Sequence, residues 1–289
     1  TGRLGFGILK RTEIVSKFEM LNQMHKIGHH QRQQVLQPQH SHQLFFAVQR
    51  LKDIANANPA FLKQPNFRAA INDDLSYFAS LYPDNPRELV KIIYDTHVGM
   101  SQTEFEQKAD DFFANAAHPR FGKLFKHMTY QPMIELIRLL ENNGFKVFIA
   151  SAGGMSFVRT VSEEIYGISR ERVIGTNVTF ETRITETGPQ LFRKAGLRDP
   201  LDDGPGKPIN IELHIGRKPI ITAGNADGDI HMLWYSQNQN RKNLQLLLVH
   251  DDEKREYAYS HGAEKAQKMA DDNKWLKVSM KNDFLKIFD

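Results

Sequence analysis

Hydrophobic residues change their spacing near residue 131, and this change divides the chain into two parts. Between residues 43 and 130 they recur at helical intervals, as in QLFFAVQRLKDIANANP and SQTEFEQKADDFFANAAHP. Ser101 followed by Glu104 forms a capping box ahead of the apolar Phe105. The pattern predicts a helical subdomain over residues 43–130.

From residue 131 onward, amphipathic helices alternate with short and almost continuous apolar runs. PMIELIRLLENNG predicts a helix that ends at Gly144, FKVFIA (145–150) predicts a buried strand, and MSFVRTVSEEIYG predicts the next helix. PIITAG, LQLLLVHDD and WLKVSM predict further strands, while RVIGTNVTFETR and ITETGPQLFR predict a small β-hairpin. This alternation favours an α/β fold over residues 131–289, in which helices cover both faces of a parallel sheet.

Residues 1–42 follow neither pattern. LGFGIL (4–9) could form a short strand, and residues 10–27 predict a helix because apolar side chains recur at helical spacing from Ile14 to Met24. Five of the 12 histidines lie in residues 25–42, within a tract rich in Gln. We expect a biased and poorly ordered segment here; a His-rich metal site is the alternative, although nothing in the sequence fixes its ligand geometry.

The composition is that of an ordinary globular chain of 289 residues, with 40% hydrophobic and 25% charged residues. The net charge of +4 is spread along the chain without a dense basic block, so we expect no nucleic-acid partner. The absence of Cys excludes disulfides, thiolate catalysis and zinc–thiolate sites. No apolar run is long enough to span a membrane.

The chain starts at Thr1 without a secretory leader pattern, so a leader has been removed or the chain is a fragment. A cytoplasmic or an exported location and the oligomeric state stay open.

Polar residues follow the predicted strands at three places. Ser151 comes directly after FKVFIA, Lys207 lies in a turn before a short helix, and an N-x-D-x-D run follows PIITAG. The members of this run are Asn225, Asp227 and Asp229. Ligands of an open parallel sheet bind at the carboxyl ends of its strands, so these side chains are candidates for one site.

These residue types suit the chemistry of a phosphoryl group. Asp229 could hold a hard cation such as Mg²⁺, Lys207 could neutralise negative charge, and Ser151 with nearby N–H groups could hold a phosphoryl oxygen. Each residue also has a simpler interpretation: a plain turn at Ser151, a surface lysine at 207, and an Asx turn or half of a calcium loop at 225–229. A calcium loop is disfavoured because its twelfth position, counted from Asn225, is Ser236 and not Glu.

Taken in order, FKVFIASAGG, GKP and ITAGNADGDIHML resemble motifs II, III and IV of the haloacid dehalogenase-like (HAD) hydrolases. QLFFAVQR, HPRF and YQPMIELIRLLENNGFKVFIASAGG are similar to the bacterial phosphoserine-phosphatase-like branch. The resemblance covers roughly residues 43–289. It implies a Rossmann-like parallel sheet with a helical cap inserted after the first strand, and Mg²⁺-dependent phosphoryl transfer from a small phosphorylated substrate through an aspartyl-phosphate.

The same resemblance assigns roles to individual residues. Ser151 matches the hydroxyl residue of motif II, Lys207 the lysine of motif III, and Asp229 the metal-binding acid of motif IV. Asn225 falls where many members carry a further acid, and Asp227 could support the metal shell. The possible substrate contacts are Gly153, Gly154, His97 and His118.

Motif I of the family is missing from this sequence. It should read D-x-D-x-T at the end of the first strand, with the nucleophile first, but counting back from Gln43 by the usual spacing gives His29 and Gln31. Residues 1–42 contain no Asp at all. The sequence therefore predicts a phosphatase impaired by loss of its nucleophile. The alternatives are a pseudophosphatase that binds a phosphate ligand without turnover, and a defective product whose first 42 residues are not native. LGFGIL could take the place of the lost central strand.

Overall fold

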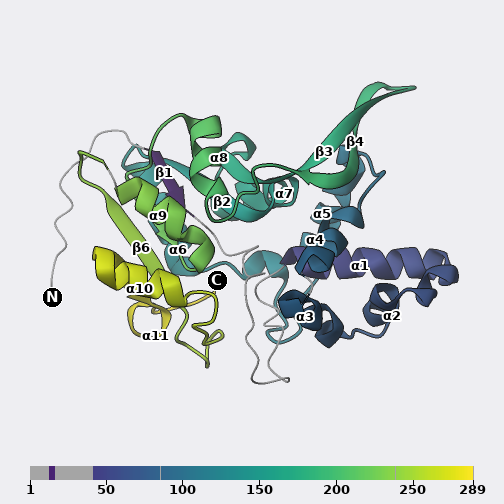
Figure 1. Cartoon of the computed structure of the whole chain (residues 1–289), viewed down its shortest axis with the longest axis horizontal. Helices are drawn as coiled ribbons and strands as arrows, with labels where there is room; N and C mark the ends of the chain where they lie inside the picture. The colour runs from purple at the N-terminus through teal and green to yellow at the C-terminus, as the bar shows by residue number, and fades with distance from the viewer. Residues whose placement is uncertain (1–12, 17–41, 85, 238, 289) are drawn as a thin grey trace.

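A computed structural model describes residues 13–16, 42–84, 86–237 and 239–288 (Figure 1). Within these residues the strands form one seven-stranded sheet in the order β4-β3-β2-β1-β5-β6-β7. The strands are β1 (Glu13–Ser16), β2 (Lys146–Gly154), β3 (Val173–Thr185), β4 (Gly188–Arg198), β5 (Ile221–Gly224), β6 (Leu244–Val249) and β7 (Leu276–Ser279). All neighbouring strands pair in parallel except β3 and β4, which form an antiparallel hairpin. The predicted α/β class with a parallel sheet and a β-hairpin is confirmed.

Helices cover both faces of the sheet, as the apolar strands require. They are α6 (Gln131–Asn142), α7 (Met155–Tyr166), α8 (Gly206–Ile215), α9 (Ile230–Gln237), α10 (Glu264–Asn273) and the short α11 (Met280–Asp283). The side chains of β2 alternate between two core clusters: Val147 and Ile149 belong with residues of α6 and α7, whereas Phe148 and Ala150 belong with residues of α8 and α9. β2 is therefore buried on both faces.

A second group of helices lies beside the sheet, and the β3–β4 hairpin projects from the same side of the molecule (Figure 1). These helices are α1 (His42–Ala57), α2 (Pro65–Ile71), α3 (Leu75–Asp84), α4 (Pro86–Asp95) and α5 (Gln102–Asn115), with the 3₁₀ turn η2 (Pro59–Lys63). Ser101 caps α5, because its side chain accepts a hydrogen bond from the N–H of Glu104, as the sequence predicted. The helices α1–α4 surround a hydrophobic cluster of their own.

Aromatic rings join this helical cap to the sheet. Phe46 of α1 packs against Phe112 of α5 and against Phe157 of α7, with ring centroids 5.5 and 5.2 Å apart. Because α7 starts directly after β2, this aromatic layer fixes the cap relative to the carboxyl end of the central strands. The described part of the chain also contains the short 3₁₀ turns η3 (Phe125–His127), η4 (Arg170–Arg172) and η5 (Asp227–Asp229).

The structure corrects the predicted helix over residues 10–27. Residues Glu13–Ser16 form β1, which lies between β2 and β5 and places Ile14 opposite Val147 and Ile221. The helical spacing was overridden because β2 and β5 each present a ladder of backbone groups that a parallel strand satisfies. The predicted strand at 4–9, most of the His-rich tract, and His29 and Gln31 lie outside the described residues.

Candidate functional site

The carboxyl end of β2 forms one wall of the candidate site. Ser151 is buried there, and its hydroxyl oxygen accepts a hydrogen bond from the N–H of Gly153 at 3.2 Å. Gly154 donates its N–H to the side-chain oxygen of Gln43 in α1 at 2.9 Å. A Cβ at position 154 would lie 2.8 Å from the Gln43 amide nitrogen, so the close contact with the cap requires glycine here. The last residue of β2 thus meets the first turn of the cap.

Lys207 lies in the first turn of α8 and points its ammonium group into the protein. Its side chain is 0% exposed, as are those of Asp202 and Asp229. The Lys207 Nζ donates a hydrogen bond to the carbonyl oxygen of Ala150 at 2.9 Å. The same nitrogen lies 3.7 Å from Asp202 Oδ2 and 3.9 Å from Asp229 Oδ1. The alternative of a surface lysine is therefore wrong: Lys207 is the cation of a fully buried ionic cluster.

Asp202 belongs to this cluster, and the sequence reasoning missed it. Its N–H donates to the hydroxyl of Thr176, and its Oδ1 accepts a hydrogen bond from the Asn210 side chain at 3.2 Å. The loop that carries Asp202 folds tightly against α8, since a Cβ at Gly206 would lie only 1.8 Å from the carbonyl oxygen of Leu201. The feature of the sequence that could have indicated Asp202 is the pair Asp202–Asp203 directly before GPGK, but such a pair is also typical of an ordinary polar turn.

Asp229 holds the loop that follows β5. Its Oδ2 accepts hydrogen bonds from the N–H groups of Asn225 at 2.9 Å and Ala226 at 3.2 Å. Gly224 permits this fold because a Cβ there would lie 2.6 Å from the Asp229 Cβ. The second oxygen of Asp229 faces Lys207, so one carboxylate both shapes the loop and joins the ionic cluster.

The structure places Asp227 differently from Asp229. Its Oδ1 accepts a hydrogen bond from the N–H of Ala266, in the first turn of α10, at 2.8 Å. Its own N–H donates to the carbonyl of Gly262. Asp227 therefore ties the loop to α10, whereas Asp229 joins Lys207 and Asp202 in the ionic cluster.

The side-chain oxygens of Asp229 and Asn225 are of the kind that binds Mg²⁺. Mg²⁺ takes oxygen ligands, and proteins usually supply one or two side chains while phosphate and water complete the shell. Asn225 is buried, and within the described part of the chain neither atom of its side-chain amide has a hydrogen-bond partner. No group of three or more His, Asp or Glu residues that could hold a metal ion occurs among residues 13–16, 42–84, 86–237 and 239–288. The residues fit a site in which Asp229 and Asn225 provide oxygens and the ligand provides the others.

The two cap histidines lie apart from this cluster. His97 is buried and stacks on Phe46 with ring centroids 4.6 Å apart. Burial, followed by the nearby charge of Arg193, lowers the pKa of His97 to about 3. His118 is also buried, and burial together with the charge of Arg120 lowers the pKa of His118 to about 4. Both rings are thus neutral at neutral pH and cannot supply positive charge to a phosphate.

The structure thus has a parallel sheet with a buried cluster of Lys207, Asp202 and Asp229 at the carboxyl ends of its strands, and a group of helices lies beside the sheet. The family model of the haloacid dehalogenase-like hydrolases matches residues 40–233, which is more than half of the chain. The chain therefore belongs to the haloacid dehalogenase-like hydrolase family. No curated protein matches the sequence.

Comparison with solved structures finds similar chains at low sequence identity. A conserved protein of unknown function from Anaerococcus prevotii is 13% identical, with a TM-score of 0.53, over 96% of this chain and 87% of that one. A phosphoserine phosphohydrolase-like protein from Francisella tularensis is 15% identical, with a TM-score of 0.40, over 89% and 99%. A probable phosphoserine phosphatase from Vibrio cholerae is 13% identical, with a TM-score of 0.40, over 83% and 56%. The first of these likenesses shows a shared fold.

One further property follows from the helices. None of those in the described residues is both long enough and apolar enough to cross a bilayer.

Proposed function

We propose that this chain is a HAD-type phosphatase by descent, whose cleft binds a small phosphomonoester together with Mg²⁺ and whose hydrolysis is impaired. The observation that supports the proposal is the buried cluster of Lys207, Asp202 and Asp229 beside Ser151. Burying an ammonium group and two carboxylates is costly and stabilises a fold less well than apolar packing of similar volume. A cluster of this kind at the carboxyl edge of a parallel sheet is therefore better explained by ligand chemistry than by stability.

Each residue of the site would make a different contact with a phosphoryl group. Lys207 is fixed by Ala150 and by both carboxylates, so its positive charge is in place before a ligand arrives. The Ser151 hydroxyl can donate to a phosphoryl oxygen, while the N–H groups of Gly153 and Gly154 are engaged by Ser151 and Gln43 and hold the shape of this wall. Asp229 and Asn225 would hold Mg²⁺, which when bound neutralises charge on the phosphoryl oxygens.

Hydrolysis is impaired because the central strand is not followed by an aspartate. β1 ends at Ser16, between β2 and β5, and the first Asp of the sequence is Asp53 in α1. The mechanism implied by the family resemblance needs a carboxylate at the end of this strand to form the aspartyl-phosphate. Without its nucleophile an enzyme loses the covalent step itself, and the remaining binding groups do not restore it.

The same observation favours a second candidate, a pseudophosphatase that binds phosphate ligands without turnover. Lys207, Asp202 and Asp229 all take part in the buried ionic cluster, although the nucleophile motif is absent from the sequence. The two candidates differ in turnover and share the binding of phosphate.

Two measurements on the purified chain test the proposal. The first is Mg²⁺-dependent phosphate release from 4-nitrophenyl phosphate, and the second is calorimetric binding of inorganic phosphate in the presence of Mg²⁺. We expect little or no release above the Asp229→Asn variant, and phosphate binding that Asp229→Asn weakens by about tenfold. Asp227→Asn should weaken binding less, because its carboxylate is already engaged by Ala266.

The other outcomes are equally informative. Turnover that disappears in Asp229→Asn would show that a nucleophile acts from elsewhere in the chain, and would refute the impairment. A folded chain that neither releases nor binds phosphate would refute the phosphate cleft altogether. Binding without any turnover would favour the pseudophosphatase over the slow enzyme.

A further inference from the structure

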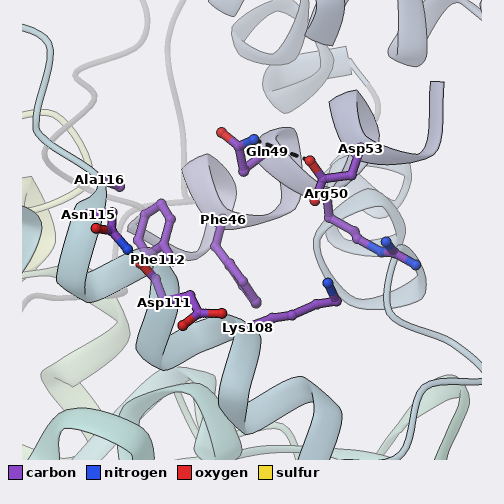
Figure 2. Close-up of a pocket in the computed structure, with 9 residues that line it drawn as sticks. All are labelled: Phe46, Gln49, Arg50, Asp53, Lys108, Asp111, Phe112, Asn115 and Ala116. Carbon is purple, nitrogen blue, oxygen red and sulfur yellow. Dashed lines mark hydrogen bonds between the residues drawn. The ribbon is translucent and has the colours of Figure 1, made fainter. Parts of the chain in front are cut away.

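A hollow of about 370 Å³ lies in the cap between α1 and α5. Residues one and two turns apart on each helix line it (Figure 2). From α1 they are Phe46, Gln49, Arg50 and Asp53; from α5 they are Lys108, Asp111, Phe112 and Asn115, and Ala116 follows. We name this hollow the α1–α5 groove. Ser151, Lys207, Asp202 and Asp229 are not among its lining residues, so it is distinct from the phosphate cleft.

The floor of the groove is aromatic and rigid. Phe46 and Phe112 are both buried, and each packs against Phe157 on the side of the sheet. A flat apolar group placed in the groove would therefore rest on two ring edges or faces that the core already holds in position. The volume lies in the range of small-molecule sites, about 300–1,000 Å³.

Two cations lie on the walls, and their side chains have no partner among the described residues. The side chains of Arg50 and Lys108 form no hydrogen bond or ion pair with any residue that the structure describes. The Nε of Arg50 is buried in addition, and an unsatisfied buried donor on a charged group is costly. In Figure 2 both side chains extend toward the same end of the groove, while Asp111 and Asn115 lie at the other end.

The acidic residues of the groove are engaged by amides and not by these cations. Asp53 accepts a hydrogen bond from the Gln49 side chain at 3.3 Å, and Asp111 accepts one from the Gln107 side chain at 3.2 Å. Below the groove, His97 stacks on Phe46 and is neutral, and the charges of Arg193, Arg50 and Lys108 all act on its ring. Asp53 and Asp111 keep their negative charges, but neither forms an ion pair with Arg50 or Lys108 among the residues that the structure describes.

We propose that the α1–α5 groove binds a small organic anion, a carboxylate or a phosphate or phosphonate carried on an apolar body. Arg50 and Lys108 contact the anionic group, and Phe46 and Phe112 contact the apolar body. The anion supplies the hydrogen-bond partner that the buried Nε of Arg50 lacks, which is what makes occupancy favourable. This site goes beyond the proposed function and does not depend on phosphate binding at Lys207.

Calorimetric titration of the full chain with benzoate and with phenylphosphonate tests the site at low ionic strength. We expect saturable binding of one molecule of at least one probe, and a loss of affinity of about tenfold or more in Arg50→Gln and in Lys108→Gln. Lys108→Gln provides the second variant if the more buried Arg50→Gln does not fold. Lys63→Gln is the matched control, because Lys63 is an exposed cation of the cap outside the groove. Its affinity should equal that of the unchanged chain.

The two probes separate the possible sources of the anion. Binding of benzoate indicates a carboxylate ligand, and binding of phenylphosphonate alone indicates a phosphoryl ligand; both outcomes support the site. Asp229→Asn distinguishes the groove from the phosphate cleft, since it should leave binding in the groove unchanged. The proposal is overturned if neither probe binds the unchanged chain, if Arg50→Gln and Lys108→Gln bind as tightly as the unchanged chain, or if Asp229→Asn alone abolishes binding.

Discussion

Replacing Lys207 by Met removes the ammonium group from a cluster in which every member is fully buried. Lys207→Met keeps the length and apolar character of the side chain, so packing changes little. Asp202 and Asp229 would then remain buried without the cation that lies 3.7 and 3.9 Å away. Removing one partner of a buried ionic group is strongly destabilising because it leaves the other charges uncompensated.

The distances set the magnitude of this effect. At an effective dielectric constant of about 20, each ion pair at these separations contributes about 4 kcal/mol of attraction. The lost hydrogen bond to Ala150, made by a charged donor, adds about 1.5–3 kcal/mol. Burial of the ammonium group costs several kcal/mol, which Met does not incur. We therefore expect Lys207→Met to lower the free energy of unfolding by about 3–5 kcal/mol.

Urea denaturation at neutral pH, followed by circular dichroism, measures this loss. The double variant Lys207→Met with Asp202→Asn provides the control, because neutralising Asp202 removes one of the uncompensated charges. The double variant should be more stable than the sum of the two single changes predicts, by at least about 1 kcal/mol. A Lys207→Met chain within about 1 kcal/mol of the unchanged protein, or strict additivity in the double variant, would refute the reasoning.

Two further predictions concern the cap and the Asp202 loop. Burial lowers the pKa of His97 from 6.5 to about 3, so between these values the unfolded chain binds a proton that the folded chain does not. The free energy of unfolding should fall as the pH drops through this window, by up to about 1.4 kcal/mol per pH unit from this residue, and urea denaturation across it should show a shallower slope in His97→Gln. Equal slopes in both chains would contradict the assignment. Gly206→Ala would place a Cβ 1.8 Å from the Leu201 carbonyl and should destabilise the protein by about 3 kcal/mol in thermal or urea unfolding. Gly216→Ala, which meets open space at a φ of +70°, should cost about 1 kcal/mol; equal losses at the two positions would show that the Asp202 loop relaxes freely.

The parts of the site that the sequence predicts are those that follow directly from a local element. Ser151 comes immediately after an apolar run, and Asp229 follows a strand that ends in glycine, so their positions could be derived from the pattern alone. The burial of Lys207 could not, because its partner Ala150 lies 57 residues away in the sequence. Asp202 was missed for the same reason: nothing in a polar loop distinguishes a buried carboxylate from a solvated one before the tertiary contacts are known.

The central strand shows how the fold and the chemistry of this family separate. β2 and β5 each need a parallel neighbour for their backbone ladders, and any short segment that can extend satisfies that need. EIVS supplies two β-branched residues, Ile14 and Val15, and pairs in register with both neighbours, although its local spacing favours a helix. The ladder requires only backbone groups, whereas the aspartyl-phosphate route that the family resemblance implies requires an aspartate at the end of the same strand. A chain can therefore keep the sheet, the buried Lys207 cluster and the cap while its sequence lacks the D-x-D-x-T motif, and for this reason the proposed test measures phosphate binding separately from turnover.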